Sequence, residues 1–220
     1  MAGTTVSDSN LVVEALTGSL EAHGFSATAA DVRPVRGYPK QQAIRHLLGA
    51  DSAAANDAAL VQQLYDDFLA IMLERCRNSP AVAPMPAAEA CFAALRSRGL
   101  RIALNTGFSR EIARTIVERF GWLHDGRIDD VIATDEVAAG RPAPDMIRAL
   151  MARLGVSDPS AAIKIGDTAV DIEEGRNARA GLVVAVTTGA FERHALQACA
   201  PDHIIDSLAE LAPLLDLSRQ

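Results

Sequence analysis

The chain has 220 residues, of which 49% are hydrophobic, and its formal net charge is −7 at pH 7. This length fits one large domain or a core with a modest insertion, and the apolar fraction is ample for a buried core. The negative charge argues against nucleic acid and anionic membranes as partners, and no apolar run has the length of a membrane span. The three cysteines, Cys76, Cys91 and Cys199, are far apart, so we expect reduced thiols in a cytoplasmic protein.

The first part of the chain has a helical pattern. Apolar residues recur at helical spacing in residues 11–24, 41–48 and 58–76, and no strand pattern interrupts them. Prolines at positions 80, 84 and 86 then break the chain. We therefore expect residues 11–79 to form an all-helical insertion.

After this break, helical and strand-like segments alternate. Alternating strands and helices are typical of an α/β core, in which helices cover both faces of a parallel sheet. We expect this core to be formed by residues 1–10 and 80–220. The expected helices cover residues 87–98, 109–120 and 144–154, and the expected strands cover residues 100–104, 131–133, 162–165, 182–186 and 204–205.

The strongest chemical signal is the run GDTAVD at residues 166–171, which follows an apolar strand pattern and opens a helix. It puts Asp167 and Asp171 at the carboxyl end of a strand, where open α/β sheets bind ligands. Oxygen ligands gathered there suit Mg²⁺ better than a softer metal. The alternative is that Asp167 only caps the helix.

This run resembles the fourth signature motif of the haloacid dehalogenase superfamily, and its continuation EEGRNA at residues 173–178 resembles the phosphonoacetaldehyde hydrolase (phosphonatase) subgroup. The resemblance implies a Rossmann-like, three-layer parallel-sheet core with a helical cap that closes over the active site. It also implies that a carboxylate at the end of the first strand attacks a small phosphonate or phosphorylated metabolite, with Mg²⁺ as cofactor. An aspartyl-phosphate intermediate then forms and is cleaved by water.

The same resemblance implies roles for residues elsewhere. Thr106 matches the hydroxyl donor of the second motif, and Arg141, in a Gly-Arg-Pro sequence, matches the fixed cation that grips phosphate. The alternatives are a plain turn hydroxyl and a surface arginine, and Ser109 is expected to cap the next helix. The implied substrate contacts are Gly3, Thr4, Arg36 and Gly107, and the implied metal site consists of Asp167, Asp171 and Ala2.

The first motif is present only in part. Residues 2–5, AGTT, resemble the tail of the phosphonatase pattern, in which the attacking Asp would directly precede Met1. We therefore expect Met1 to be an internal methionine, the preceding apolar strand to be missing, and the sequence as it stands to have little hydrolase activity. Ala2 occupies the position where ordinary phosphatases have a second Asp as general acid and base, which again favours phosphonatase.

Lys40 lies where phosphonatase has the lysine that forms a Schiff base with its aldehyde substrate. The alternative is a solvated lysine at the start of a helix. Two neighbours depart from the phosphonatase pattern: Ala43 replaces a histidine, and Arg36 replaces a methionine. Arg36 would suit a more anionic or bulkier substrate.

Three functions stay open on the sequence. The first is a phosphonatase-like hydrolase that uses Mg²⁺ to cleave a P–C or P–O bond. The second is a general phosphatase or phosphomutase of the same superfamily, and the third is an inactive binding or regulatory protein, consistent with the absent Asp. A homodimer is a further hypothesis.

Overall fold

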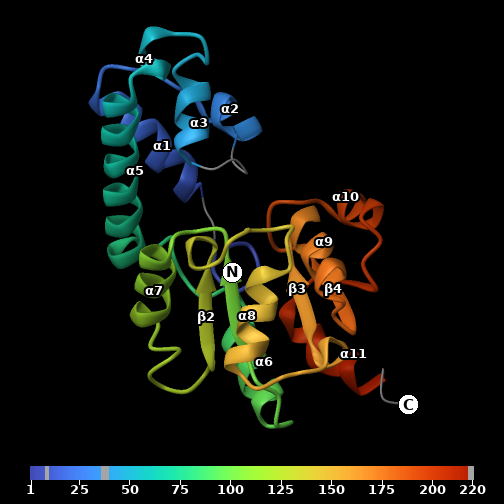
Figure 1. Ribbon diagram of the computed structural model, residues 1–220. Coiled ribbons are helices and arrows are strands. Elements are labelled where there is room, and N and C mark those ends of the chain that lie inside the picture. Colours follow the sequence, from blue (N-terminus) through green and yellow to red (C-terminus); the bar gives the residue numbers. More distant parts are fainter. Residues whose placement is uncertain (8–9, 36–39, 218–220) are drawn as a thin grey trace. The chain divides into compact units, whose positions relative to one another are not determined.

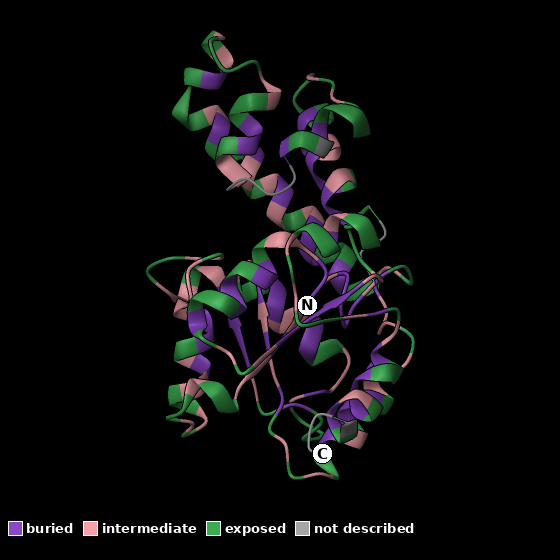
Figure 2. Cartoon of the chain, turned by 90° about the vertical axis from the view of Figure 1, so that its right-hand side faces the viewer, coloured by how far each residue is buried: buried purple, intermediate pink, exposed green. Residues whose placement is uncertain are grey.

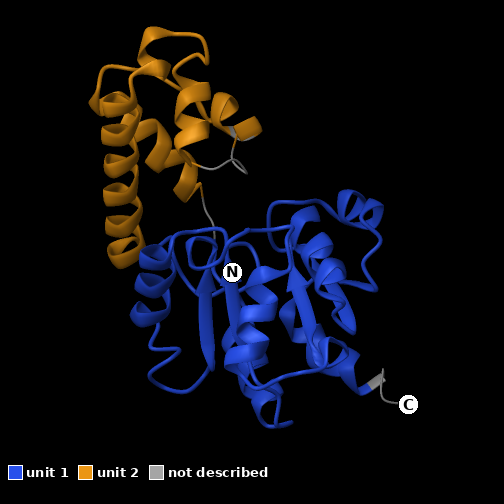
Figure 3. Cartoon of the chain, in the orientation of Figure 1, with its two compact units in different colours: residues 1–8, 80–220 blue, residues 9–79 orange. Residues whose placement is uncertain are grey.

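The computed structural model describes residues 1–7, 10–35 and 40–217 (Figure 1). Buried positions follow the strands and one side of most helices (Figure 2). The chain divides into two compact units: unit 1 comprises residues 1–8 and 80–220, and unit 2 comprises residues 9–79 (Figure 3). No helix among the described residues is both long enough and apolar enough to cross a membrane.

Unit 2 is helical throughout its described residues. The long helix α5 packs against α1, α3 and α4, and its buried face includes Leu64, Phe68 and Met72. It begins at Asp57, whose carboxylate accepts hydrogen bonds from the first free N–H groups of the helix. The helices of unit 2 are α1 (Leu11–Ala22), α2 (Ala29–Val32), α3 (Lys40–Leu47), α4 (Ala53–Asn56) and α5 (Ala58–Asn78), with a 3-10 turn at Arg33–Val35.

Unit 1 is an α/β core with parallel strands, so the predicted fold class is confirmed. Its strands are β1 (Ala103–Thr106), β2 (Asp130–Ala133), β3 (Ile163–Gly166), β4 (Leu182–Val186) and β5 (His203–Ile205). Its helices are α6 (Ala88–Arg96), α7 (Arg110–Arg119), α8 (Asp145–Arg153), α9 (Ala169–Ala178), α10 (Arg193–Ala198) and α11 (Leu211–Leu217). In Figure 2 the strands run through the middle of this unit with helices on either side.

The strands form two sheets, with orders β1-β2 and β3-β4-β5. Strand β4 is paired on both edges, and four of its five residues are buried, which explains its continuous apolar sequence. Strand β1 begins later than predicted. The N–H of Leu100 still bonds to the carbonyl of Leu95 at the end of α6, so residue 100 belongs to the helix terminus.

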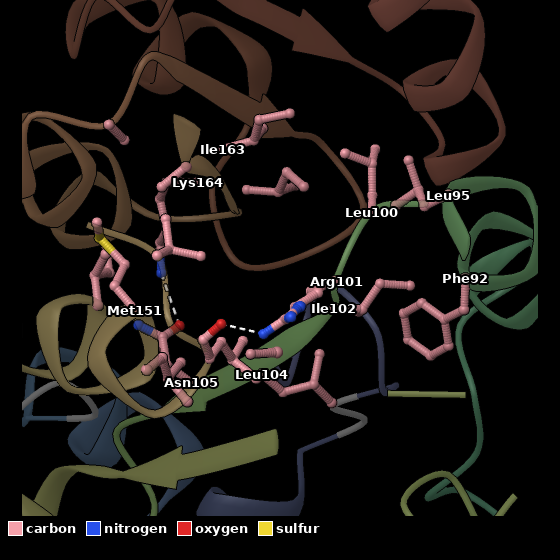
Figure 4. Close-up of a pocket in the computed structure, with 18 of the residues that line it drawn as sticks. Phe92, Leu95, Leu100, Arg101, Ile102, Leu104, Asn105, Met151, Ile163 and Lys164 are labelled. Atoms are coloured by element: carbon pink, nitrogen blue, oxygen red, sulfur yellow. Dashed lines mark hydrogen bonds between the residues drawn. The ribbon is translucent and has the colours of Figure 1, made fainter. Parts of the chain in front are cut away.

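A cavity of about 500 Å³ lies between β1 and β3. Each of these strands pairs with only one other strand, and residues of both line the cavity, among them Leu104 and Ile163 (Figure 4). Helices α6, α8 and α11 add apolar side chains such as Phe92, Ile147 and Leu211. The walls of the cavity are therefore two strands and the apolar sides of the flanking helices.

The two connections to unit 2 leave unit 1 next to each other. The N–H of Ser7 bonds to the carbonyl of Ala83, and the Ser7 hydroxyl accepts from the N–H of Ala83. One step further in, the N–H of Met85 bonds to the carbonyl of Thr5. These bonds tie the amino-terminal segment to the segment in which the chain returns.

Candidate active site

Asp167 follows β3 directly and is buried. One carboxylate oxygen accepts from the Thr4 hydroxyl at 2.9 Å, and the other accepts from the main-chain N–H of Ala190 at 2.9 Å. The N-cap residue of α9 is Thr168, so Asp167 does not have the helix-capping position that the sequence left open. Asp167 instead joins the amino-terminal loop to the loop that follows β4.

Two glycines allow main chain to approach Asp167 closely. A Cβ atom added at Gly3 or at Gly189 would overlap the Asp167 carboxylate. Gly3 also has a φ of +77°, which side-chain-bearing residues rarely adopt. The Thr188 hydroxyl donates to the carbonyl of Gly3 at 2.8 Å and fixes this turn. Main-chain atoms of both loops therefore form the wall around the carboxylate.

Asp171 lies in the first turn of α9 and is also buried. Its Oδ1 accepts from Arg141 at 2.5 Å and from Lys164 at 3.0 Å, and its Oδ2 accepts from the Thr168 hydroxyl at 2.5 Å. Burial alone would raise the pKa of this carboxyl. The neighbouring Lys164 and Arg141 outweigh burial and hold the pKa of Asp171 well below its usual range, so the group is ionised.

Arg141 comes from the loop between β2 and α8, and its side chain is only 20% exposed. A Cβ atom added at Gly107 would lie 3.0 Å from its guanidinium, so the end of β1 and the Arg141 loop are in contact. Thr106 is buried at the same strand end, where its hydroxyl accepts from the N–H of Phe108 at 3.2 Å. The carboxyl ends of β1 and β3, with the loops after β2 and β4, thus meet at one edge of the core.

The amino-terminal residues lie at this same edge. The amine of Met1 is 3.3 Å from the carbonyl oxygen of Asn105, and burial lowers the pKa of this amine to about 6, although Asp171 partly offsets the effect. Ala2 forms a single bridge with Val6.

A predicted catalytic residue, Lys40, and a predicted substrate contact, Arg36, lie elsewhere in the chain. Lys40 begins α3 in unit 2 and is half-buried. Arg36 lies outside the described residues. Six of the predicted residues therefore make site contacts with one another within unit 1: Gly3, Thr4, Gly107, Arg141, Asp167 and Asp171.

One local prediction was wrong. Ser109 holds the N-cap position of α7, but its side chain makes no capping bond and its hydroxyl has no hydrogen-bond partner. The Asp135 carboxylate accepts from the N–H of Arg110 instead, at 2.9 Å. An acceptor from another loop has taken the place of the local cap.

The sequence analysis did not identify three polar residues that lie near Asp171: Lys164, Glu174 and Asn105. Lys164 lies in the middle of β3, and its ammonium contacts Glu174 at 2.6 Å and the Asn105 side-chain oxygen at 2.8 Å. Both Lys164 and Glu174 are buried. The signal was available, because a lysine inside an apolar strand is unusual unless a partner neutralises it.

The donor set of the site fits Mg²⁺. Asp167 and Asp171 offer hard oxygen atoms, and Mg²⁺ is commonly held by one or two carboxylates while it keeps several waters. Within residues 1–7, 10–35 and 40–217, no group of three or more His, Cys, Asp or Glu side chains gathers as a larger metal site. The protein would therefore supply the two carboxylates, whose hard oxygen atoms suit Mg²⁺ better than softer metals.

Comparisons with known proteins identify the family of the chain. Residues 1–179 match the family of haloacid dehalogenase-like hydrolases. Phosphonoacetaldehyde hydrolase of Paraburkholderia phytofirmans is 32% identical over 247 residues, which cover 97% of this chain and 91% of the relative. The same enzyme of Bordetella pertussis is 29% identical over 202 residues, with 74% and 72% covered.

Solved structures share the fold. A phosphonoacetaldehyde hydrolase-like protein from Oleispira antarctica has a TM-score of 0.79 at 24% identity, with 99% of this chain and 90% of that chain covered. A predicted phosphoglycolate phosphatase from Haemophilus somnus has a TM-score of 0.82 at 16% identity, with 98% and 95% covered. The resemblance inferred from the motifs is confirmed, and the chain belongs to the haloacid dehalogenase-like hydrolase family.

Proposed function

We propose that the protein is a magnesium-dependent hydrolase that cleaves a small phosphonate or phosphorylated metabolite through an aspartyl-phosphate intermediate. The observation that carries this proposal is the meeting of the Arg141 guanidinium with the ionised Asp171, at the same strand edge as Asp167. A fixed cation beside two carboxylates suits a phosphoryl group together with a divalent metal. The phosphonoacetaldehyde hydrolase relatives support the substrate class.

Each residue of the site has a proposed task. Arg141 binds two phosphoryl oxygens with its paired donors, and the Thr106 hydroxyl and the main-chain N–H of Gly107 donate to the remaining charge. The N–H groups of Gly3 and Thr4 bond to the carbonyls of Val6 and Met1, so these two predicted substrate residues shape the wall of the site. Asp167 and Asp171, with the carbonyl of Ala2, are the proposed metal ligands; a bound Mg²⁺ would neutralise phosphoryl charge. The attacking carboxylate that the resemblance implies is supplied, in the test below, by an extension ahead of Met1.

We further propose that unit 2 acts as a cap and that Lys40 determines the bond that is cleaved. In P–C cleavage, the Lys40 amine condenses with the substrate aldehyde and releases water. The resulting iminium accepts the electron pair of the breaking P–C bond and becomes an enamine, while the phosphoryl group is transferred to the attacking carboxylate as an aspartyl phosphate. Protonation and hydrolysis of the enamine release the aldehyde and the Lys40 amine, and water cleaves the aspartyl phosphate.

A phosphatase acting on phosphate esters is the second candidate. Ala43, a buried residue of α3, stands where phosphonatase has a histidine, so one expected group of the P–C reaction is absent. Without an aldehyde substrate, Lys40 would act only as an electrostatic contact.

Borohydride trapping separates the two candidates. The test uses a variant extended ahead of Met1 by an apolar strand that ends in Asp, with phosphonoacetaldehyde as substrate. The sequence has only two lysines, Lys40 and Lys164, so peptide mass locates the adduct without ambiguity. P–C cleavage predicts reduction of the imine onto Lys40, and Lys40→Arg should abolish both the adduct and turnover.

Other outcomes would refute this assignment. An adduct on Lys164, or turnover of the aldehyde without any adduct, would refute the Schiff-base role of Lys40. Hydrolysis of a phosphate ester that survives Lys40→Arg would establish the phosphatase instead. Turnover that persists in EDTA would refute the magnesium requirement.

A further inference from the structure

The Lys164 ammonium is fully engaged although it is buried. An ammonium has three protons, and the structure provides three acceptors: Glu174 at 2.6 Å, Asn105 at 2.8 Å and Asp171 at 3.0 Å. We call Asn105, Lys164, Asp171 and Glu174 the Lys164 cluster. Figure 4 shows Lys164 and Asn105 pointing toward one another at the cavity between β1 and β3. The position of the charge is therefore determined from three sides.

Glu174 and Asn105, which both contact Lys164, also bond to each other. Glu174 is completely buried on α9, and both of its carboxylate oxygens accept from the Asn105 amide nitrogen at 2.8 Å. Because the Asn105 amide oxygen faces Lys164 while its nitrogen faces Glu174, its orientation has one solution. The cluster thus connects β1, β3 and α9 by side chains.

The two carboxylates at the site edge differ in what surrounds them. Asp171 receives two cations on one oxygen and a hydroxyl on the other. Asp167 receives one hydroxyl and one main-chain N–H, both uncharged donors. A further cation that approaches Asp171 meets the repulsion of Lys164 and Arg141. Among the residues that the structure describes, the hydrogen-bond donors to the Asp167 carboxylate are uncharged, so a cation that approaches Asp167 meets less repulsion.

We propose that Lys164 is a positioning residue: it holds Asp171 against two protein cations, and so makes Asp167 the stronger of the two proposed Mg²⁺ ligands. In this arrangement Glu174 keeps the ammonium in place. The inference rests on the proposed function, since it concerns how the same site divides its carboxylates between metal and protein cations.

Calorimetry with Mg²⁺ alone, on the full chain, tests this division. Lys164→Met removes the competing charge, so Mg²⁺ should bind about tenfold tighter or more, because a unit charge within a few Å of a divalent ion has at least this effect. Glu174→Gln keeps the ammonium and removes its counter-charge, so Mg²⁺ should bind several-fold weaker. A role of Lys164 in folding alone would weaken binding in both variants.

Arg176→Met is the matched control. Arg176 lies on α9 as well and pairs with Asp202 at 2.7 Å, but both side chains are partly exposed. Its removal should leave the Mg²⁺ affinity unchanged within about twofold, since exposed pairs are well screened.

A second test needs no metal: thermal unfolding measures whether Lys164 and Asp171 stabilise the fold through their mutual contact. Lys164→Gln can still donate to Glu174 and is the milder substitution if Lys164→Met does not fold. In a thermal-unfolding cycle, Lys164→Gln combined with Asp171→Asn should lower Tm by less than the sum of the two single losses, because both remove the same contact. Additive losses would overturn the inference.

The outcomes separate this inference from the proposed function. Mg²⁺ binding to the native chain, with shifts of the same sign in Lys164→Met and Glu174→Gln, would overturn the inference alone. Absence of Mg²⁺ binding in every variant would overturn the proposed function and, with it, the division between the two carboxylates.

Discussion

The cavity between β1 and β3 leads to a quantitative prediction. The perturbation is an engineered extension of about five Val and Ile residues ahead of Met1, which lies at the carboxyl end of β1, close to Asn105. Such a segment can run parallel to both strands and bond to each of them. Because apolar side chains of α6, α8 and α11 line the cavity, both faces of the added strand would be buried.

The magnitude follows from the cavity volume. At about 24 cal/mol per Å³, filling about 500 Å³ contributes about 12 kcal/mol. Ordering about five more residues costs about 1.5 kcal/mol each. The remaining gain, about 4.5 kcal/mol, corresponds to a rise in Tm of about 9–18 °C for a protein of this size.

The assay is thermal unfolding followed by the fluorescence of Trp122, the only tryptophan of the chain, which is buried and packs edge-on against Phe92 of the cavity wall. The control is the same extension with a central proline, which cannot bond as an inner strand. Both extensions also move the buried amine away from Met1, so the difference between them isolates the strand. A Tm for the apolar variant no higher than that of the proline variant would refute the reasoning.

Three further predictions concern single side chains. Asp167→Asn should weaken Mg²⁺ binding by about tenfold or more because it removes a charged ligand; an unchanged affinity in calorimetry would remove Asp167 from the metal site. Because the folded protein holds the pKa of Asp171 below its usual value of 3.8, the unfolded chain takes up the proton first as pH falls, and stability should decline below about pH 4. Asp171→Asn should flatten this acid limb of Tm against pH, and an unaltered limb would contradict the assignment. Burial raises the pKa of the Cys91 thiol to about 11, so at pH 8 a thiol reagent should label the half-buried Cys199 first; peptide mass showing Cys91 labelled first would contradict this.

Local patterns were sufficient to predict most of the fold. The helical spacing of residues 58–76 predicted α5 almost to its ends, and the apolar run 182–186 predicted β4. The strand at residues 100–104 was misplaced because Leu100 completes the bonds of the preceding helix. The short helices α2 and α4 were missed, since four residues are too few to show a helical period.

The site was predictable where a residue type is tied to a motif. Motifs led to the prediction of Asp167, Asp171 and Arg141, and the structure brings Arg141 onto Asp171 from 30 residues away. Lys164 and Glu174 were not found, because their pairing depends on how α9 lies on β3. A helix packed against a strand has no register that can be read from the sequence of either element.

The hydrogen bonds between Ser7 and Ala83, which hold together the two segments that connect to unit 2, affect the chain entropy of folding. Seen from unit 1, residues 9–79 are one long closed loop whose ends are already held together by hydrogen bonds. Closing such a loop instead of a four-residue turn adds roughly four doublings of length, about 2.5 kcal/mol in total. Unit 2 has a buried core of its own, and the burial of these apolar side chains offsets the entropy cost of closing the loop. A short turn could therefore replace the insertion between Ser7 and Ala81. The strands, the hydrogen bonds of the amino-terminal segment and the surroundings of Asp167 would then stay as they are, because the two ends already lie side by side.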